Sequence, residues 1–193
     1  IILAATNVME EAYQITVDAL GSQTLDAVVI DSLPALVPGE EAEKSMAEFA
    51  VGLGARLTGK FMRKSSKAQR RSLVHEERPC LALIINQWRE KIGITFGDPR
   101  TTPGGKAKNF HYFTRVELAR DKWLFRPGTE ESKDKIRVGL TIKGRTIKNK
   151  TAPPQRVGMA DFYFSDVPGT GLRAGEYDTA REVFEMGVAY DVV

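Results

Sequence analysis

Two short polar sequences follow apolar runs of the kind that form buried strands. Asp31-Ser32 ends the run from Leu25 to Ile30, and Asn86-Gln87 ends the run from Leu81 to Ile85. Ligands of open α/β sheets bind beyond the carboxyl ends of the strands, so both pairs would border one crevice. There Asp31 could hold Mg²⁺ on a nucleotide, and Gln87 could orient a water or sense a terminal phosphate. The alternatives are a turn or cap residue at Asp31 and plain strand termination at Asn86-Gln87.

A segment of roughly 17 residues follows Gln87, whereas connections in compact domains are usually about 4–6 residues long. It mixes cations with apolar side chains and with glycines that keep the backbone free. Cations neutralise phosphates, and apolar side chains can wedge between bases or stack on them. We therefore predict a nucleic-acid-binding loop that becomes ordered on binding, with a surface lid as the alternative. The candidate contacts are Arg89, Lys91, Ile94, Phe96, Arg100, Gly104, Gly105 and Lys106.

A third cluster of charge lies near the end of a later strand. In "IKNK", Lys148 and Lys150 alternate, and alternate residues of an extended chain point to the same side. The pair could reach a phosphate, including one on a neighbouring subunit. The simpler interpretation is a solvated strand end.

These candidates require a parallel α/β sheet to bring them together. The order strand, helix, strand at the start of the chain is typical of such a sheet, and period-two segments after residue 110 predict added antiparallel strands. The expected elements are a strand end over 1–5, helices over Glu10–Leu20 (capped by Gly21), Ser45–Ser72 and Gly105–Phe110, strands over Leu25–Ile30 and Cys80–Ile85, and a last helix over Thr179–Val188. In the second helix, the apolar stripe is Met46, Phe49, Leu53, Leu57 and Phe61.

The composition is that of a soluble globular protein, with 42% hydrophobic and 27% charged residues. No apolar run approaches the roughly 18 residues of a membrane span. The net charge of +3 is mild evidence for nucleic acid. The one cysteine, Cys80, excludes an internal disulfide, fits a reducing compartment and reads as a small buried hydrophobe.

Other chemistries have weaker support. "GARLTGKF" looks like a phosphate loop, but Phe61 stands where a hydroxyl should bind Mg²⁺, and no strand precedes it. His75 and His111 lack cysteine or carboxylate partners at metal spacing, which argues against zinc. No serine or cysteine has the local pattern of an activated nucleophile.

Five segments, in their order along the chain, resemble the RecA family of bacterial and phage DNA recombinases. They are "VVIDSLPALVP", "GLGARLTGKFMRK", "IINQWREKIGITFGDPRTTPGGKAKNF", "IKNKTAPP" and "FEMGVAYDVV". The combination is specific, although no single segment is. The resemblance implies an α/β fold of the RecA-like P-loop NTPase type, with a mostly parallel central sheet, helices on both faces and an added antiparallel region. It implies one ATPase core domain over 1–193, with the family's phosphate loop and catalytic glutamate expected before Ile1 and its C-terminal domain expected after Val193.

The resemblance also assigns roles. Asp31 resembles the Walker B aspartate with Ser32 as its companion, and Gln87, beside Asn86, resembles the glutamine that senses the γ-phosphate. Lys148 and Lys150 resemble the pair that reaches across a filament interface to the neighbour's ATP, and Arg115 resembles a family arginine on the strand after the loop. Residues 88–103 resemble the second DNA-binding loop, which adds Thr101 and Thr102 to the contacts, and 38–49 resemble the first.

The function so implied is ATP-dependent recombination. Subunits would form a helical homo-oligomeric filament on single-stranded DNA, with ATP and Mg²⁺ as cofactors, and promote pairing and strand exchange with double-stranded DNA in repair. The expected location is the bacterial cytoplasm, away from membranes. Two alternatives remain: a hexameric replicative helicase of the DnaB type, and a recombination mediator that binds DNA without hydrolysing ATP.

Five positions depart from the family pattern. Asp98, Arg100 and Pro103 replace the common Asn, Glu and Thr, and Trp88 replaces a smaller aliphatic residue. Asn109 stands where the family usually has lysine. These departures favour a divergent member of phage origin.

Overall fold

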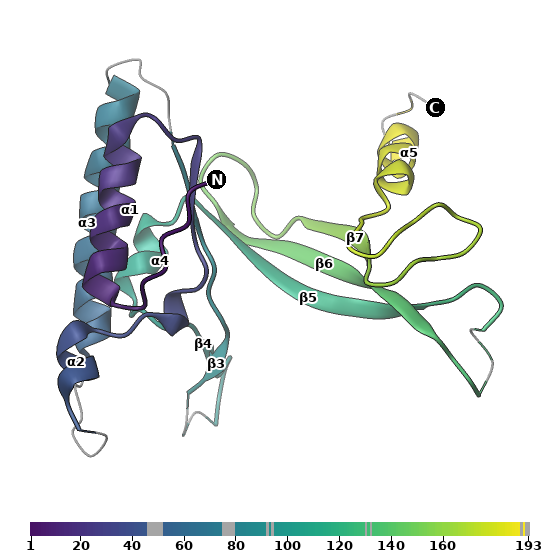
Figure 1. Ribbon diagram of the computed structural model, residues 1–193, viewed down its shortest axis with the longest axis horizontal. Helices are drawn as coiled ribbons and strands as arrows, with labels where there is room; N and C mark the ends of the chain where they lie inside the picture. Colours follow the sequence, from purple (N-terminus) through teal and green to yellow (C-terminus); the bar gives the residue numbers. More distant parts are fainter. Residues whose placement is uncertain are drawn as a thin grey trace. The chain divides into compact units, whose positions relative to one another are not determined.

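The computed structural model describes residues 1–45, 52–74, 80–91, 93, 95–129, 131, 133–189 and 191 of the chain. They form two compact units, Ile1–Tyr112 and Phe113–Val193, each with its own sheet (Figure 1). Met46, Phe49 and Ile94, which the sequence analysis singled out, lie outside the described residues. None of the helices in the described ranges combines the length and the apolar character that crossing a membrane requires.

In the first unit, two helices cover one face of a short parallel sheet. α1 (Met9–Ser22) and α3 (Leu53–Val74) lie side by side (Figure 1), and β1 (Ala27–Ile30) pairs in parallel with β2 (Leu81–Ile84). Successive side chains of a strand point to opposite faces. Ile30 and its partner Ile84 therefore meet the helices, whereas Val29, Leu81 and Leu83 on the other face are about half exposed.

The core of this unit is built on an aromatic pair that joins the two helices. Tyr13 of α1 stacks on Phe61 of α3 with 4.2 Å between ring centroids. Its hydroxyl lies 2.8 Å from that of Thr58, which in turn donates to the carbonyl of Gly54. Burial raises the pKa of Tyr13, so the ring carries a neutral, hydrogen-bonded hydroxyl in an apolar core.

Most expected elements of this unit are confirmed, with shifted ends. α1 ends at Ser22, one residue beyond the glycine, so the C-cap residue Gln23 takes the left-handed conformation (φ 60°) expected of Gly21. The strand expected over 1–5 is wrong: these residues are not in a strand, and the first sheet contact is a bridge from Val8 to Val37. The long helix begins at Leu53, after a five-residue helix, α2 (Gly39–Glu43).

The α/β class is confirmed, but the larger sheet is not shown. Within the described residues the parallel part consists of β1 and β2, and helices cover one of its faces. Cys80, just before β2, is buried as predicted, and burial raises the pKa of its thiol.

The long segment after β2 has regular structure at both of its ends. β3 (Arg89–Glu90) pairs antiparallel with β4 (Arg100–Thr101), and Lys91 donates its backbone N–H to the carbonyl of Pro99 at 2.9 Å. The segment is therefore a hairpin on a stem rather than a loop without structure. α4 (Ala107–His111) follows, close to the predicted short helix, and contacts α3.

The second unit is an antiparallel sheet followed by a helix, as the period-two segments predicted. The strands β5 (Thr114–Phe125), β6 (Arg137–Asn149) and β7 (Val157–Tyr163) lie in the order β5-β6-β7, and α5 (Thr179–Ala189) follows (Figure 1). Irregular register at three points along β5 indicates bulges. The carbonyl of buried Val138 in β6 accepts the backbone N–H groups of Phe164 and Ser165, which joins the segment after β7 to the sheet.

Candidate functional site

The two polar pairs singled out from the sequence leave the same edge of the parallel sheet. Ile85 donates its N–H to the carbonyl of Ile30 at 3.0 Å, and Leu33 donates to the carbonyl of Ile85 at 3.0 Å. Asp31-Ser32 and Asn86 therefore follow directly on paired strand ends, the position at which α/β sheets bind ligands. Asp31 is exposed and Ser32 half-buried, and the peptide bond between them is cis.

The donors at this edge suit magnesium held on a nucleotide. Asp31 offers a carboxylate and Ser32 a hydroxyl, both hard oxygen donors. Across the described ranges, no three His, Cys, Asp or Glu side chains gather into a metal site. Mg²⁺ is commonly bound through one or two carboxylates with phosphate oxygens completing its shell, so this edge fits a metal that arrives with a phosphorylated ligand.

Asn86 and Gln87 have different roles in the structure. The Asn86 amide nitrogen donates to the carbonyl of Pro103 at 3.1 Å, and its amide oxygen accepts the backbone N–H of Gln87 at 2.8 Å. Asn86 thus ties the start of the hairpin to its end. The Gln87 side chain is exposed beside this tie and is the amide of the pair presented to a ligand.

The end of the hairpin is fixed by a residue that the sequence analysis missed. Lys108 of α4 is 2% exposed, and its ammonium group donates to the carbonyls of Thr102 (3.1 Å) and Gly105 (2.6 Å). A lysine in a short basic helix carries no sequence signal of burial, so pattern reading could not single it out.

Gly104 and Gly105 have a conformational role at this stem. Both have positive φ (93° and 73°), and a Cβ on Gly104 would lie 2.8 Å from Leu33 and 3.1 Å from Thr58. Only glycine fits such a position without strain. Gly104 packs against the segment after β1 and against α3, and Gly105 lies against Ala55 of α3. Their contact with nucleic acid stays a prediction.

The candidate contacts of the hairpin differ in exposure. Lys91, Arg89 and Lys106 are exposed, and Phe96 is 97% exposed at the tip. Thr101, in β4, and Thr102 are half-buried at the stem, and Thr102 offers its carbonyl to the buried lysine described above. Arg89 and Phe96 are therefore more accessible to an external ligand than the threonines, whose contacts with nucleic acid stay a prediction.

Arg100 is engaged within the hairpin. Its Nη2 donates to Oδ2 of Asp98 at 2.9 Å, its Nε lies 3.1 Å from Oδ1, and its guanidinium carbon lies 4.8 Å from the ring centroid of Trp88. The hydrogen bonds from Arg100 hold the pKa of Asp98 below its usual value of 3.8.

A cavity of about 300 Å³ lies beside the hairpin stem in the first unit. Arg89, Pro103 and Gly104 line it from the hairpin, and Pro38 and Glu41 line it from the segment expected to form the first DNA-binding loop. The described parts of the two expected DNA-binding segments therefore border one hollow.

In the second unit, the predicted lysine pair belongs to a cationic cluster. Lys148 lies opposite Arg115 in the β5–β6 register, and Lys150 Nζ lies 6.0 Å from the ring centroid of Phe113. Partial burial, then the charges of Lys150 and Arg115, lower the pKa of Lys148. Neighbouring positive charges disfavour protonation, so an anion at this strand end would relieve their repulsion.

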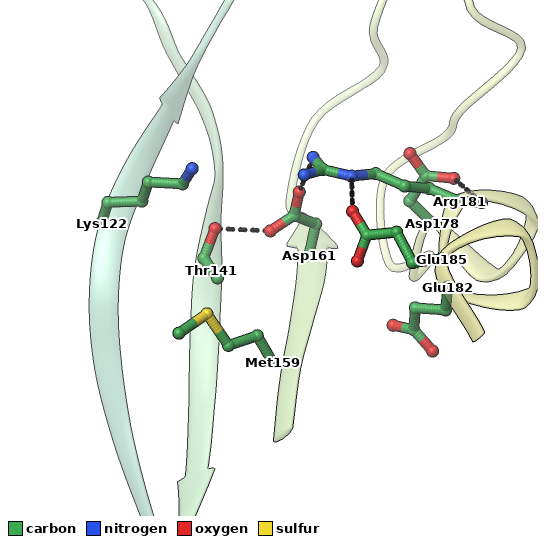
Figure 2. A pocket seen from close by; sticks show the side chains of 8 residues that line it. All are labelled: Lys122, Thr141, Met159, Asp161, Asp178, Arg181, Glu182 and Glu185. Carbon is green, nitrogen blue, oxygen red and sulfur yellow. Dashed lines mark hydrogen bonds and ion pairs between the residues drawn. The ribbon is translucent and has the colours of Figure 1, made fainter. Parts of the chain in front are cut away.

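A cavity of about 80 Å³ between the sheet and α5 was not predicted (Figure 2). Figure 2 shows Arg181 of α5 beside Asp161 of β7, with 2.8 Å between Nη1 and Oδ2, and also beside Glu185. Asp161 is buried and accepts a hydrogen bond from Thr141. Four carboxylates and two cations line the cavity. The ion pair between Asp161 and Arg181 joins α5 to the sheet at this point.

Comparison with known protein sequences gives matches along most or all of the chain. The model of the RecA N-terminal domain matches residues 1–168. Protein RecA of Lactobacillus delbrueckii subsp. bulgaricus is 36% identical over 194 residues, which cover 100% of this chain and 52% of that protein. Protein RecA of Thermus thermophilus is 34% identical over 185 residues, which cover 92% of this chain and 51% of that protein. Protein RecA of Bacillus pumilus is 35% identical over 193 residues, which cover 100% of this chain and 49% of that protein.

The chain thus spans about half the length of the curated relatives it matches. The family model covers most of the chain, and these relatives share more than 30% identity with it over 92–100% of its length. The chain belongs to the RecA family.

Proposed function

We propose that the protein is an ATP-dependent DNA recombinase that assembles as a filament on single-stranded DNA and promotes homologous pairing and strand exchange. The observation that carries the proposal is the path from the strand edge to the hairpin. Asp31 and Asn86 follow paired strand ends, and Asn86 binds the far end of the hairpin that begins at Gln87. A change in what Gln87 contacts would therefore act directly on the hairpin.

In this proposal, Asp31 and Ser32 hold Mg²⁺ on ATP, which supplies the phosphoryl group that is hydrolysed. Gln87 contacts the terminal phosphate and links its presence to the hairpin. Arg89, Lys91, Phe96 and Lys106 are exposed for contact with DNA, the cations on phosphates and the ring on bases. We infer further that both units belong to one ATPase core.

Lys148 and Lys150 act on ATP held by a neighbouring subunit. Cations supplied by a second subunit stabilise the charge that develops on a transferred phosphoryl group. The cluster with Arg115, in which Lys148 has a lowered pKa, supports an anion-binding role for this strand end.

The experiment is ATP hydrolysis by the complete gene product, with and without single-stranded DNA, at low and moderate salt. We expect DNA to stimulate hydrolysis strongly, and Asp31→Asn to abolish that activity. DNA binding without hydrolysis would instead favour a mediator. Hydrolysis by closed rings rather than helical filaments, seen by electron microscopy, would favour the helicase.

A further inference from the structure

Three of the five departures from the family pattern lie in contact with one another in the hairpin. Trp88, Asp98 and Arg100 form a cluster, called here the Arg100 cluster: the guanidinium covers the indole, and the carboxylate holds the guanidinium. The Arg100 backbone N–H also donates to Oδ1 of Asp98 at 2.9 Å, which fixes the start of β4 against the same carboxylate. The three departures at Trp88, Asp98 and Arg100 therefore form one group of interacting side chains rather than three independent changes.

We propose that Trp88 is a base-stacking surface for single-stranded DNA, which Arg100 covers in the DNA-free protein and uncovers when a DNA phosphate replaces Asp98 as its partner. This proposal rests on the DNA-binding function proposed for the hairpin. It adds Trp88 to the DNA contacts expected from the sequence. It also makes Asp98 a competitor of DNA for Arg100.

The contacts of the cluster can be exchanged because they are open to solvent. The side chains of Arg100 and Asp98 are 41% and 58% exposed, and Trp88 is 38% exposed. An exposed ion pair of this kind contributes little to stability. A phosphate offers the guanidinium the same paired oxygen acceptors as the Asp98 carboxylate, so replacing one by the other keeps the geometry of both hydrogen bonds.

The indole released by this exchange suits an unpaired base. Every base has a π face, so stacking on Trp88 would be tolerant of sequence, and an unstacked base is available in a single strand but not in an intact duplex. The register supports simultaneous contact: Glu90 pairs with Arg100, and Trp88, two residues before Glu90, lies on the same face of the hairpin, diagonally across from Arg100. One nucleotide could thus place its base on Trp88 and its phosphate on Arg100.

The chain contains a matched control for the tryptophan. Trp123 in β5 is also flanked by guanidinium groups, with Arg120 at 4.4 Å and Arg137 at 4.8 Å from its ring, but it lies in the sheet of the second unit. Trp123→Phe therefore tests the loss of an arginine-covered indole away from the hairpin.

The test uses the full-length protein, a fluorescently labelled dT oligonucleotide and a non-hydrolysable ATP analogue, with fluorescence anisotropy at several salt concentrations. We expect Trp88→Ala to weaken binding about 5- to 100-fold, the effect of losing one stacked base. Trp88→Phe, which keeps an aromatic face, should recover most of the affinity, and Trp123→Phe should bind as the wild type does. DNA should quench the tryptophan emission of the wild type and of Trp123→Phe, and quench that of Trp88→Phe much less.

The covering role of Arg100 has its own variants. Asp98→Asn should tighten binding by up to about fivefold, because the exposed ion pair no longer competes with phosphate. Arg100→Gln should weaken binding and reduce the salt slope, d log K/d log[salt], by about 0.7, the loss of one phosphate contact on a single strand. Circular dichroism of each variant establishes that it is folded.

The outcomes separate the two proposals. If the wild type fails to bind the oligonucleotide in any nucleotide state, the proposed function fails and this inference with it. If the wild type binds but Trp88→Ala binds equally well, Trp88 is not a stacking surface, and the inference alone is overturned. Weaker binding by Asp98→Asn would show that Asp98 supports the DNA-bound hairpin, which contradicts the covering role.

Discussion

The ammonium group of Lys108 lies 2.6 Å from the carbonyl oxygen of Gly105, and the amide nitrogen of Asn86 lies 3.1 Å from the carbonyl oxygen of Pro103. Two side chains from different elements thus bind neighbouring carbonyls at one end of the hairpin. One of them, Asn86, follows the strand that ends at the candidate nucleotide site. The stem of the hairpin is therefore tied both to the sheet edge and to α4.

Removing the buried ammonium should loosen this stem. In Lys108→Met the aliphatic part of the side chain is kept, but the carbonyls of Thr102 and Gly105 lose a donor. A hydrogen bond from a charged donor contributes about 1.5–3 kcal/mol, and we expect a decrease of that order in the free energy of unfolding measured with urea. Lys106→Met is the control, because Lys106 is exposed two residues away. Equal stability of both variants would show that the Lys108 hydrogen bonds do not hold the stem.

The side chain of Gln87 should be needed for coupling rather than for binding. Because it is exposed beside the Asn86–Pro103 tie, Gln87→Ala should leave the fold and basal DNA binding intact. The enhancement of single-stranded DNA binding by a non-hydrolysable ATP analogue should be lost. The measurement is DNA affinity with and without the analogue, and unchanged enhancement in the variant would remove Gln87 from the switch.

A residue of this site could be predicted when a local sequence pattern marks it, and could not when its position depends on tertiary contacts. Asp31 and Gln87 could be found because apolar strands ending in polar residues are a local pattern, and parallel pairing then brings such ends together. Lys108 could not, because its burial depends on glycines and carbonyls of the hairpin folding over α4. The end of α1 was misplaced for a similar reason: Gly21 favours a stop, but the contacts of α1 with α3 carry the helix on to Ser22.

The lysine pair of β6 should affect turnover without affecting folding. Lys148→Ala combined with Lys150→Ala removes two cations from a cluster in which partial burial, and then neighbouring positive charges, lower the pKa of Lys148. We expect DNA-stimulated ATP hydrolysis by the complete protein to fall at least about 100-fold, as when a charge-stabilising group is lost from an active site. Lys135→Ala is the matched control, because Lys135 also lies over a phenylalanine, Phe125, at 5.6 Å. Full activity in the double variant would show that Lys148 and Lys150 do not act on ATP and are only solvated residues at the end of a strand.

The thiol of Cys80 should react slowly in the native protein. Burial, and then the charge of Asp26, raise its pKa above the ordinary 9.0, so less thiolate is present at any pH below that value. Since the thiolate is the reactive form, alkylation by iodoacetamide should be slow at pH 7–8, and its rate should still be rising with pH at pH 9. In denaturant, the dependence of the alkylation rate on pH should follow the ordinary pKa of a cysteine thiol. Cys80→Ser serves as the blank. Fast native labelling at pH 7 would mean that the strand before the hairpin opens readily.

Gly139, near the start of β6, should be needed for the close packing of the antiparallel sheet. A Cβ on Gly139 would lie 2.5 Å from the carbonyl oxygen of Phe162 and 3.1 Å from the ring of Tyr163, so alanine there must push β7 away from β6. Overpacking of this kind costs about 1–3 kcal/mol, and we expect Gly139→Ala to lower the free energy of unfolding by that amount. Gly158→Ala, in β7, is the matched control, because its Cβ would meet nothing within 4 Å. If urea unfolding gave the same stability for both variants, β6 and β7 could not be packed as closely as the structure has them.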